Sequence, residues 1–272
     1  MFYEQRLHEI ALEASVNQFD ITELPPHPLL YPFIQSYTII HNHDVNISTP
    51  WLILPESSTY LILHIIQTLD STPIVRLSLI GPRSQFIQID RKQRKLTILL
   101  RFRMGGAQAF FSKIMPELTD ESVNIKELWH DEFLEYEEAL LNAAKELSYW
   151  KCLEILEKIL LKKLHLLKNT HPVITIFNKI CQSNHEILTI AQIATQLGIT
   201  ERYLRKLVKD HTGLSPKSIL KIERLTHSLK LWNRSPQPNW ASIAAEAGYF
   251  DQSHMIDEYQ SLIGRSPGKL LK

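Results

Sequence analysis

Two stretches decide the fold: IATQLGITERYLRKLVKDHTGLSP at residues 193–216 and IAAEAGYFDQSHMIDEYQSLIGRSP at residues 243–267. Each contains an Ile-Ala pair, a turn glycine and a closing Gly-x-Ser-Pro. The Ile-Ala pair recurs after 50 residues and the Gly-x-Ser-Pro ending after 51. A short helix, a glycine turn and a second helix are typical of the helix-turn-helix motif. The repetition therefore predicts two such units in tandem.

Capping signals mark where the helices of the first unit begin and end. Thr189 and Gln192 have the spacing of a capping box, and Thr200 is placed to cap the helix that follows. Gly213 ends that helix, and Pro216 suits the first turn of a longer one. We therefore predict a recognition helix at 200–210 and a linking helix at 216–233.

The predicted recognition helix at 200–210 carries only positive charge along one face. Its cations are Arg202, Arg205, Lys206 and Lys209, at spacings i, i+3, i+4 and i+7. Such a helix fits the major groove, where arginine bonds guanine and lysine bonds bases or phosphates. We expect it to bind double-stranded DNA; a merely solvated charged face is the alternative.

The second unit presents a different surface. Its second helix, predicted over 251–262, contains no lysine or arginine. We expect Asp257 and Glu258 to face phosphates unfavourably. The unit therefore either reads few bases, through Gln252, Ser253 or His254, or mainly supports the first unit.

Basic residues are concentrated in the C-terminal part of the chain. Residues 1–170 hold 17 Lys and Arg against 21 Asp and Glu, whereas residues 171–272 hold 13 against 8. A basic C-terminal third on an acidic remainder favours a nucleic-acid partner for that third.

The front part is predicted to be β-rich. Six short apolar runs bounded by turn residues read as strands, at 33–40, 51–54, 60–66, 74–80, 86–89 and 96–102. With no long helix between them, they favour an antiparallel barrel or sandwich. A short amphipathic helix is expected at 1–17 and a helical tail at about 132–168. Pro172 then sets the boundary between a domain at 1–171 and one at 172–272.

The helical tail carries a stripe of leucines at spacings of three and four. The stripe comprises Leu153, Leu156, Leu160, Leu164 and Leu167. It either packs on its own domain or forms the seam of a homodimer. Cys152 lies beside it without a neighbouring histidine, so we interpret it as a core thiol, and Cys181 likewise as a reduced thiol in the cytoplasm.

Few residues of the front part are candidates for a metal, ligand or catalytic site. His41 and His43 have the spacing of half a metal site, but no further ligands follow, so we expect no metal and no cofactor. Arg101 and Arg103 are expected to share a strand face, where they bind an anionic effector or pair with acids of their own domain. No nucleophile–base pair is recognisable, so we expect no enzyme. No apolar run is long enough to span a membrane, and we expect a cytoplasmic, nucleoid-associated protein.

The second stretch, with Gly-Tyr-x-Asp-Gln-Ser-His followed by Gly-x-Ser-Pro, resembles the C-terminal signature of the AraC/XylS family of transcription regulators. The resemblance covers about 173–271. It implies recognition helices at 200–210 and 251–262 in adjacent major-groove segments, and RNA polymerase as a partner. The implied DNA-contacting residues are Arg202, Tyr203, Arg205, Lys206, Lys209, Gln252, Ser253 and His254. Asp257 departs from the family, which usually has a basic residue there.

Segments of the front part, including 54–58, 81–83 and 101–107, are similar to the sensor domains of such regulators. This resemblance implies a cupin-like sensory domain without naming a ligand. The chain is therefore interpreted as a sequence-specific regulator, an activator, whose front domain senses a small molecule. The alternative is a ligand-free dimeric regulator whose front domain only mediates assembly.

Overall fold

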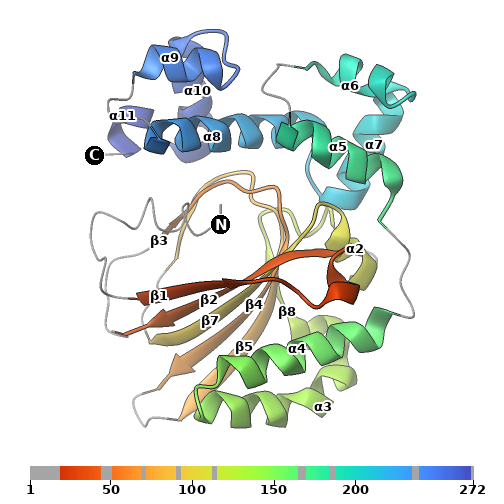
Figure 1. Cartoon of the computed structure of the whole chain (residues 1–272), viewed down its shortest axis with the longest axis vertical. Helices are drawn as coiled ribbons and strands as arrows, with labels where there is room; N and C mark the ends of the chain where they lie inside the picture. Colours follow the sequence, from red (N-terminus) through yellow and green to blue (C-terminus); the bar gives the residue numbers. More distant parts are fainter. Residues whose placement is uncertain are drawn as a thin grey trace.

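The computed structural model describes residues 19–43, 51–68, 72–89, 93–111, 115–164, 170–183, 188–234 and 239–270. A β-rich front part is followed by a part made only of helices (Figure 1), which confirms the expected fold class. The helix expected at 1–17 lies outside the described residues, as does Leu167.

Six strands form one antiparallel sheet in the order β1-β2-β7-β4-β5-β8. Their bounds are Phe19–Leu24 (β1), Ile34–Asn42 (β2), Arg94–Phe102 (β7), Tyr60–Gln67 (β4), Pro73–Ile80 (β5) and Ser122–Asn124 (β8). Strands β3 (Trp51–Ile53) and β6 (Ile87–Ile89) form a separate antiparallel pair. Within the described strands, β1 and β8 are the two edges, so the six-stranded sheet is open there. The expectation missed these two edge strands.

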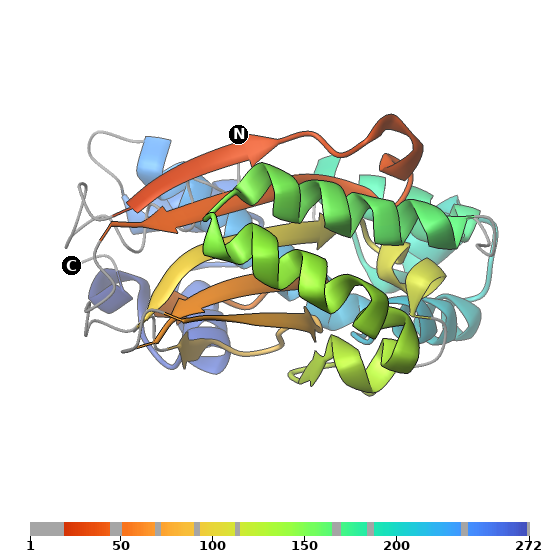
Figure 2. The same cartoon turned by 90° about the horizontal axis from the view of Figure 1, so that it is seen from below.

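Two antiparallel helices cover one face of this sheet (Figure 2), α3 (Ile125–Lys145) and α4 (Tyr149–Lys163). They occupy the region predicted as a single helical tail, and the chain reverses between them. Leu147 has a φ of +51° at the reversal. Ser148 then caps α4, because its hydroxyl accepts a hydrogen bond from the Lys151 N–H at 3.4 Å.

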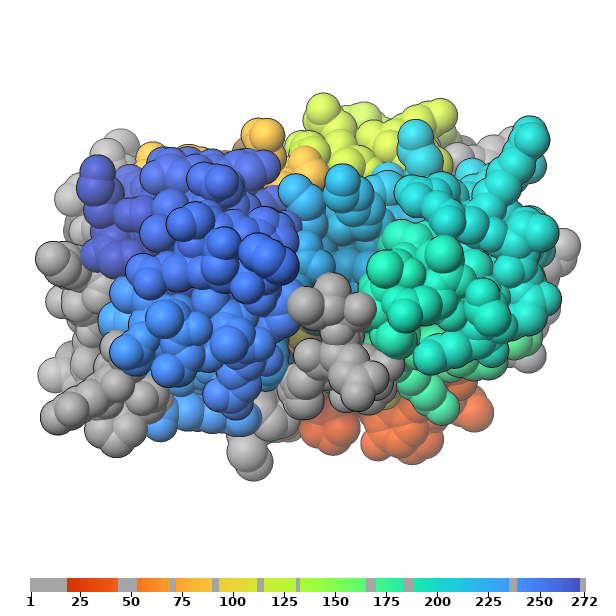
Figure 3. Space-filling view, turned by 90° about the horizontal axis from the view of Figure 1, so that it is seen from above, coloured from red at the N-terminus to blue at the C-terminus, as the bar shows by residue number. Residues whose placement is uncertain are grey.

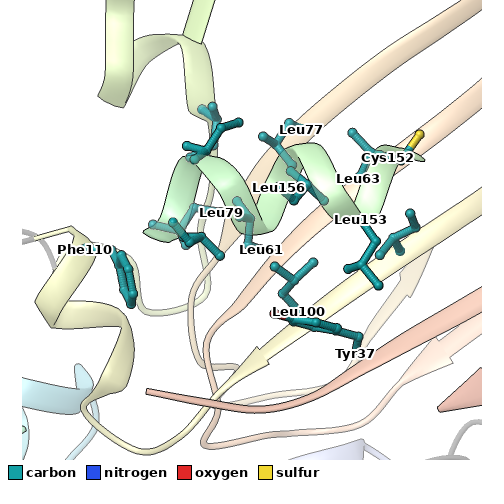
Figure 4. Packing of buried hydrophobic residues seen from close by; sticks show 14 of the residues in the cluster. Tyr37, Leu61, Leu63, Leu77, Leu79, Leu100, Phe110, Cys152, Leu153 and Leu156 are labelled. Atoms are coloured by element: carbon teal, nitrogen blue, oxygen red, sulfur yellow. The ribbon is translucent and has the colours of Figure 1, made fainter. Parts of the chain in front are cut away.

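The leucine stripe of α4 packs on its own domain. Leu153, Leu156 and Leu160 are buried against the sheet, where alternate residues of β4 and β5 such as Leu61 and Leu77 meet them (Figure 4). The dimer-seam interpretation of this stripe is therefore wrong, because its described leucines are already covered.

Both cysteines are reduced thiols with raised pKa values. Cys152 lies in the same core as the leucine stripe, and its burial raises the pKa of the thiol to about 11, which keeps it protonated. Burial also raises the pKa of Cys181. The interpretation of Cys152 as a core residue is confirmed.

The C-terminal helices form a layer on the other side of the sheet (Figure 1). They are α5 (Pro172–Ser183), α6 (Ile190–Gln196), α7 (Glu201–Thr212), α8 (Pro216–Arg234), α9 (Trp240–Glu246), α10 (Gln252–Ile263) and α11 (Pro267–Leu270). Two short helices, η1 (Pro28–Leu30) and α2 (Gly106–Phe110), belong to the front part. In the described part of the chain, no helix combines the length and the apolar character that crossing a bilayer requires.

Helix α8 joins two separate apolar cores. Ile219 and Ile222 pack with α5, α6 and α7 in the first unit. One turn further on, Leu225 and Leu229 pack with α9 and α10 in the second. The two units therefore share one rod, and they lie side by side when the molecule is seen from above (Figure 3).

Candidate nucleic-acid interface

Helix α7 is held so that its cations point to solvent. The Thr200 hydroxyl accepts a hydrogen bond from the Tyr203 N–H at 3.2 Å and caps the helix, and Gly213, with φ of +83°, ends it. Leu204 and Val208 are fully buried and fix the rotation of the helix about its axis. The five candidate residues of this helix are all exposed: Arg202, Tyr203, Arg205, Lys206 and Lys209.

Two acids, Glu201 and Asp210, flank the positive face of α7, and Glu201 pairs with one of its cations. The Glu201 carboxylate accepts a hydrogen bond from Arg205 Nε at 2.8 Å, one helical turn away. Both side chains are about half exposed, so the pair adds little to stability and can open when a phosphate competes for the guanidinium. The Glu-to-Arg spacing of four could have indicated this pair from the sequence.

The second unit presents polar rather than basic side chains. Asp251 caps α10, because its carboxylate accepts a hydrogen bond from the His254 N–H at 2.7 Å. Gln252, Ser253 and His254 are exposed. The His254 ring folds back on the preceding turn, where Nδ1 accepts a hydrogen bond from the Phe250 N–H at 3.3 Å.

The expectation that both Asp257 and Glu258 of α10 face phosphates is wrong for Glu258. Its side chain is 2% exposed and binds Arg224 of α8 through both oxygens, at 3.1 Å from Nε and 2.8 Å from Nη2. Lys221 Nζ lies 3.7 Å from the same carboxylate. Only Asp257 of the pair is exposed. The charge of Glu258 is thus neutralised inside the unit, and it fastens α10 to α8.

The front domain touches both units near the C-terminal end of their second helix. The Thr119 hydroxyl donates to the carbonyl oxygen of Gly213 at 3.0 Å, at the end of α7. The Phe86 N–H donates to the carbonyl oxygen of Leu262 at 3.1 Å, near the end of α10. Between them, the Ser57 hydroxyl donates to the Glu223 carboxylate of α8 at 3.2 Å. The relative position of the two units therefore depends partly on the front domain.

The predicted pair of effector-binding arginines is separated. Arg101 lies in β7, donates to the Ser58 hydroxyl at 3.0 Å and forms an ion pair with Glu56 at 3.0 Å. Arg103 lies beyond the end of β7, and its Nε donates to the carbonyl oxygen of Tyr31 at 2.6 Å. The two arginines therefore have different partners, and Arg101 takes the alternative of an acid in its own domain.

The two histidines at the end of β2 lie near an acid. His43 Nε2 is 3.0 Å from the Asp20 carboxylate, and the His41 and His43 rings are 5.9 Å apart between centroids. Across the described ranges, no group of three or more His, Cys, Asp or Glu side chains is arranged to hold a metal ion.

His64 lies on the face of the sheet opposite α3 and α4. Its Nδ1 is 2.9 Å from the Thr97 hydroxyl, and its Nε2 is 3.3 Å from the Arg94 guanidinium. Burial, together with the charges of Arg94 and Arg76, lowers the pKa of His64 from 6.5 to about 3. The imidazole is therefore neutral in the folded protein at neutral pH.

This lowered pKa predicts an acid-sensitive front domain. Between about pH 6.5 and 3, the unfolded chain binds a proton that folded His64 does not, so the free energy of unfolding falls as the pH falls. The expected loss is about 2 kcal/mol at pH 5 relative to neutral pH. Urea titrations at pH 7 and 5 measure it. His64→Gln should remove most of the difference, whereas His43→Gln should leave it; equal losses in wild type and His64→Gln would contradict the assignment.

Comparison with known proteins identifies the helical part. Residues 193–272 match the family model of a helix-turn-helix domain. This segment is an AraC-type DNA-binding domain. The resemblance to AraC/XylS transcription regulators is thereby confirmed. In front of the AraC-type domain, residues 22–124 match a family described as a domain of unknown function. A comparison with curated proteins gives no match.

Solved structures with weak similarity include ToxT from Vibrio cholerae. One crystal structure, from strain O395, has 12% identity and a TM-score of 0.43, covering 88% of this chain and 96% of that one. A second, at 1.65 Å resolution, has 12% identity and a TM-score of 0.44, covering 94% and 98%. A third, of ToxT with bound unsaturated fatty acid, has 12% identity and a TM-score of 0.40, covering 94% and 95%. At these identities and TM-scores, the ligands and partners of ToxT cannot be assigned to this chain.

Proposed function

We propose that this chain is a sequence-specific regulator that binds promoter DNA through α7 and α10 and responds to a small molecule bound by its front domain. The main support is the row of cations on α7, all exposed on a helix whose opposite side is locked in a core. Arg202, Arg205, Lys206 and Lys209 offer the bidentate and point-charge donors that guanine and phosphate require. The resemblance to the AraC/XylS family extends the proposal to transcription activation, with RNA polymerase as a partner.

The proposed response is a shift between two arrangements of the DNA-reading units. The front domain holds the end of α7 through Thr119, the end of α10 through Phe86, and α8 through Ser57. A molecule that binds one arrangement of the front domain better than another changes how often the units lie at the spacing of adjacent major-groove segments. The sheet face opposite α3 and α4, which carries Thr97 and His64, is the proposed place for it, since the face beneath α3 and α4 is filled by the core.

The double substitution Arg205→Ala/Lys206→Ala tests DNA binding. Removing two groove-facing cations should weaken binding to a selected duplex at least about tenfold. It should also lower the slope of log affinity against log salt by about 2. Gel-shift titrations of the full-length protein at several salt concentrations measure both.

A control variant that loses the same charge elsewhere separates the loss of direct DNA contacts from the loss of net positive charge. Lys151→Ala/Lys162→Ala removes two exposed cations from α4 in the front domain. Each is paired with a surface acid, and Lys162 also lies over the Tyr136 ring. This variant should bind DNA with nearly the affinity and salt slope of the wild type. If the α7 double variant behaves like the control, α7 is not the DNA-binding helix.

A further inference from the structure

The second helix-turn-helix unit contains one residue more than the first, at a defined point. Ile199 and Tyr249 are equivalent, because their N–H groups donate to Ala194 and Ala244 at 3.0 and 2.8 Å at the same step of the turn. They are 50 positions apart, whereas the N-caps that follow, Thr200 and Asp251, are 51 apart. The additional residue is Phe250, between the turn and the cap of α10.

Phe250 is held away from the protein by the residues on both sides of it. Its side chain is 89% exposed, the largest value among the exposed large hydrophobic residues of the described ranges, whereas Tyr249 beside it is 3% exposed. The turn is fastened by the hydrogen bond from the Phe250 N–H to His254 and by edge-on packing of the Tyr249 ring on His254, 5.6 Å between centroids. Because the backbone at Phe250 is already held, a contact made by its side chain orders little further backbone.

The position of the Phe250 ring, just before the N-terminus of α10, favours DNA over the front domain as its contact. The front domain binds the other end of α10, where Phe86 meets Leu262 and Gly264. Twelve residues of helix, about 18 Å, separate that contact from Phe250. The N-terminal residues of a recognition helix are those that reach base edges.

The side chains of α10 indicate which kind of contact Phe250 makes with DNA. This helix has no lysine or arginine and offers guanine no bidentate cation. An apolar side chain in the major groove discriminates bases by touching the C5-methyl group of thymine. We propose that Phe250 is a specificity residue of the second unit that packs against a thymine methyl group. The inference rests on the proposed function, because it assumes that α10 enters the groove.

Removal of the methyl group tests the proposal directly. Duplexes that bind full-length protein are first selected from a random library, and each thymine of a selected site is then replaced by uracil. At one position in the part read by the second unit, the wild type should lose about fourfold in affinity, the value for one buried methyl group. Phe250→Ala should bind the thymine site at least fourfold more weakly and should no longer distinguish uracil from thymine at that position.

Controls separate the possible failures. Phe250→Leu should retain part of the discrimination, and Phe250→Ala should keep the salt slope of the wild type, because no charge is removed. Phe250→Ala with wild-type affinity or with undiminished sensitivity to uracil overturns the inference while leaving the proposed function intact. Failure of the wild type to select any duplex overturns both.

Discussion

Replacement of Glu258 with alanine should destabilise the second unit by about 2 to 4 kcal/mol. The substitution leaves the guanidinium of Arg224 and the ammonium of Lys221 without their common partner. Both cations keep some contact with water, at 22% and 31% exposure, which places the cost toward the lower part of the range for broken buried pairs. Glu258 also joins α10 to α8, so its loss should loosen the position of α10 as well.

Amide hydrogen exchange over α9 and α10 measures this effect within the second unit. Asp257→Ala is the matched control, since it removes the same charge from the neighbouring, exposed position and should change stability by less than about 0.5 kcal/mol. Arg224→Ala and the double variant complete a cycle that isolates the pairwise energy. Equal protection in Glu258→Ala and Asp257→Ala would show that the ion pair contributes nothing.

The helical part was predictable because its signals are local. Thr189, Thr200 and Asp251 cap helices within three residues of themselves, and Gly213 ends α7 through its own backbone conformation. The inward position of Glu258 was also present in the sequence. Met255, Glu258, Tyr259 and Leu262 follow the spacing i, i+3, i+4 and i+7 of a buried face, although the charge of Glu258 argued for the opposite position. Its partner Arg224 lies 34 residues away, and no local rule identifies it.

The front part was less predictable because its organisation depends on distant pairings. The six expected strands are present, but β1 mixes apolar with polar residues and β8 has only three residues, and both are edge strands that form by pairing with β2 and β5. The partners of Arg101 and Arg103 likewise come from distant segments, Glu56 and Tyr31. The contacts of Thr119, Phe86 and Ser57 with the AraC-type domain join residues 94 or more positions apart and have no signature in the sequence.

The second large effect concerns the contact between the front domain and α7. A side chain at Gly213 should break this contact, because an added Cβ would lie 2.3 Å from the Met115 carbonyl oxygen and 2.6 Å from the Thr119 hydroxyl. The backbone oxygen cannot move aside as the end of a flexible side chain can. Gly213→Ala should therefore lose the hydrogen bond from Thr119 to Gly213 and expose residues 115–121 to rapid hydrogen exchange.

Gly198→Ala is the control that isolates this collision. Gly198 has φ of +66°, so alanine there carries a similar left-handed backbone strain of about 1 kcal/mol, but its added Cβ meets nothing within 4 Å. Both variants should lose some stability in the first unit, whereas only Gly213→Ala should release the front domain. If the front domain restrains α7 as proposed, Gly213→Ala should also change the affinity for a selected duplex, whereas Gly198→Ala should not. Thr119→Val, which deletes the hydroxyl that binds Gly213, should produce part of the same change. Unchanged exchange at 115–121 in Gly213→Ala would mean that the front domain does not hold α7 in solution, and the proposed transmission through this contact would have to be abandoned.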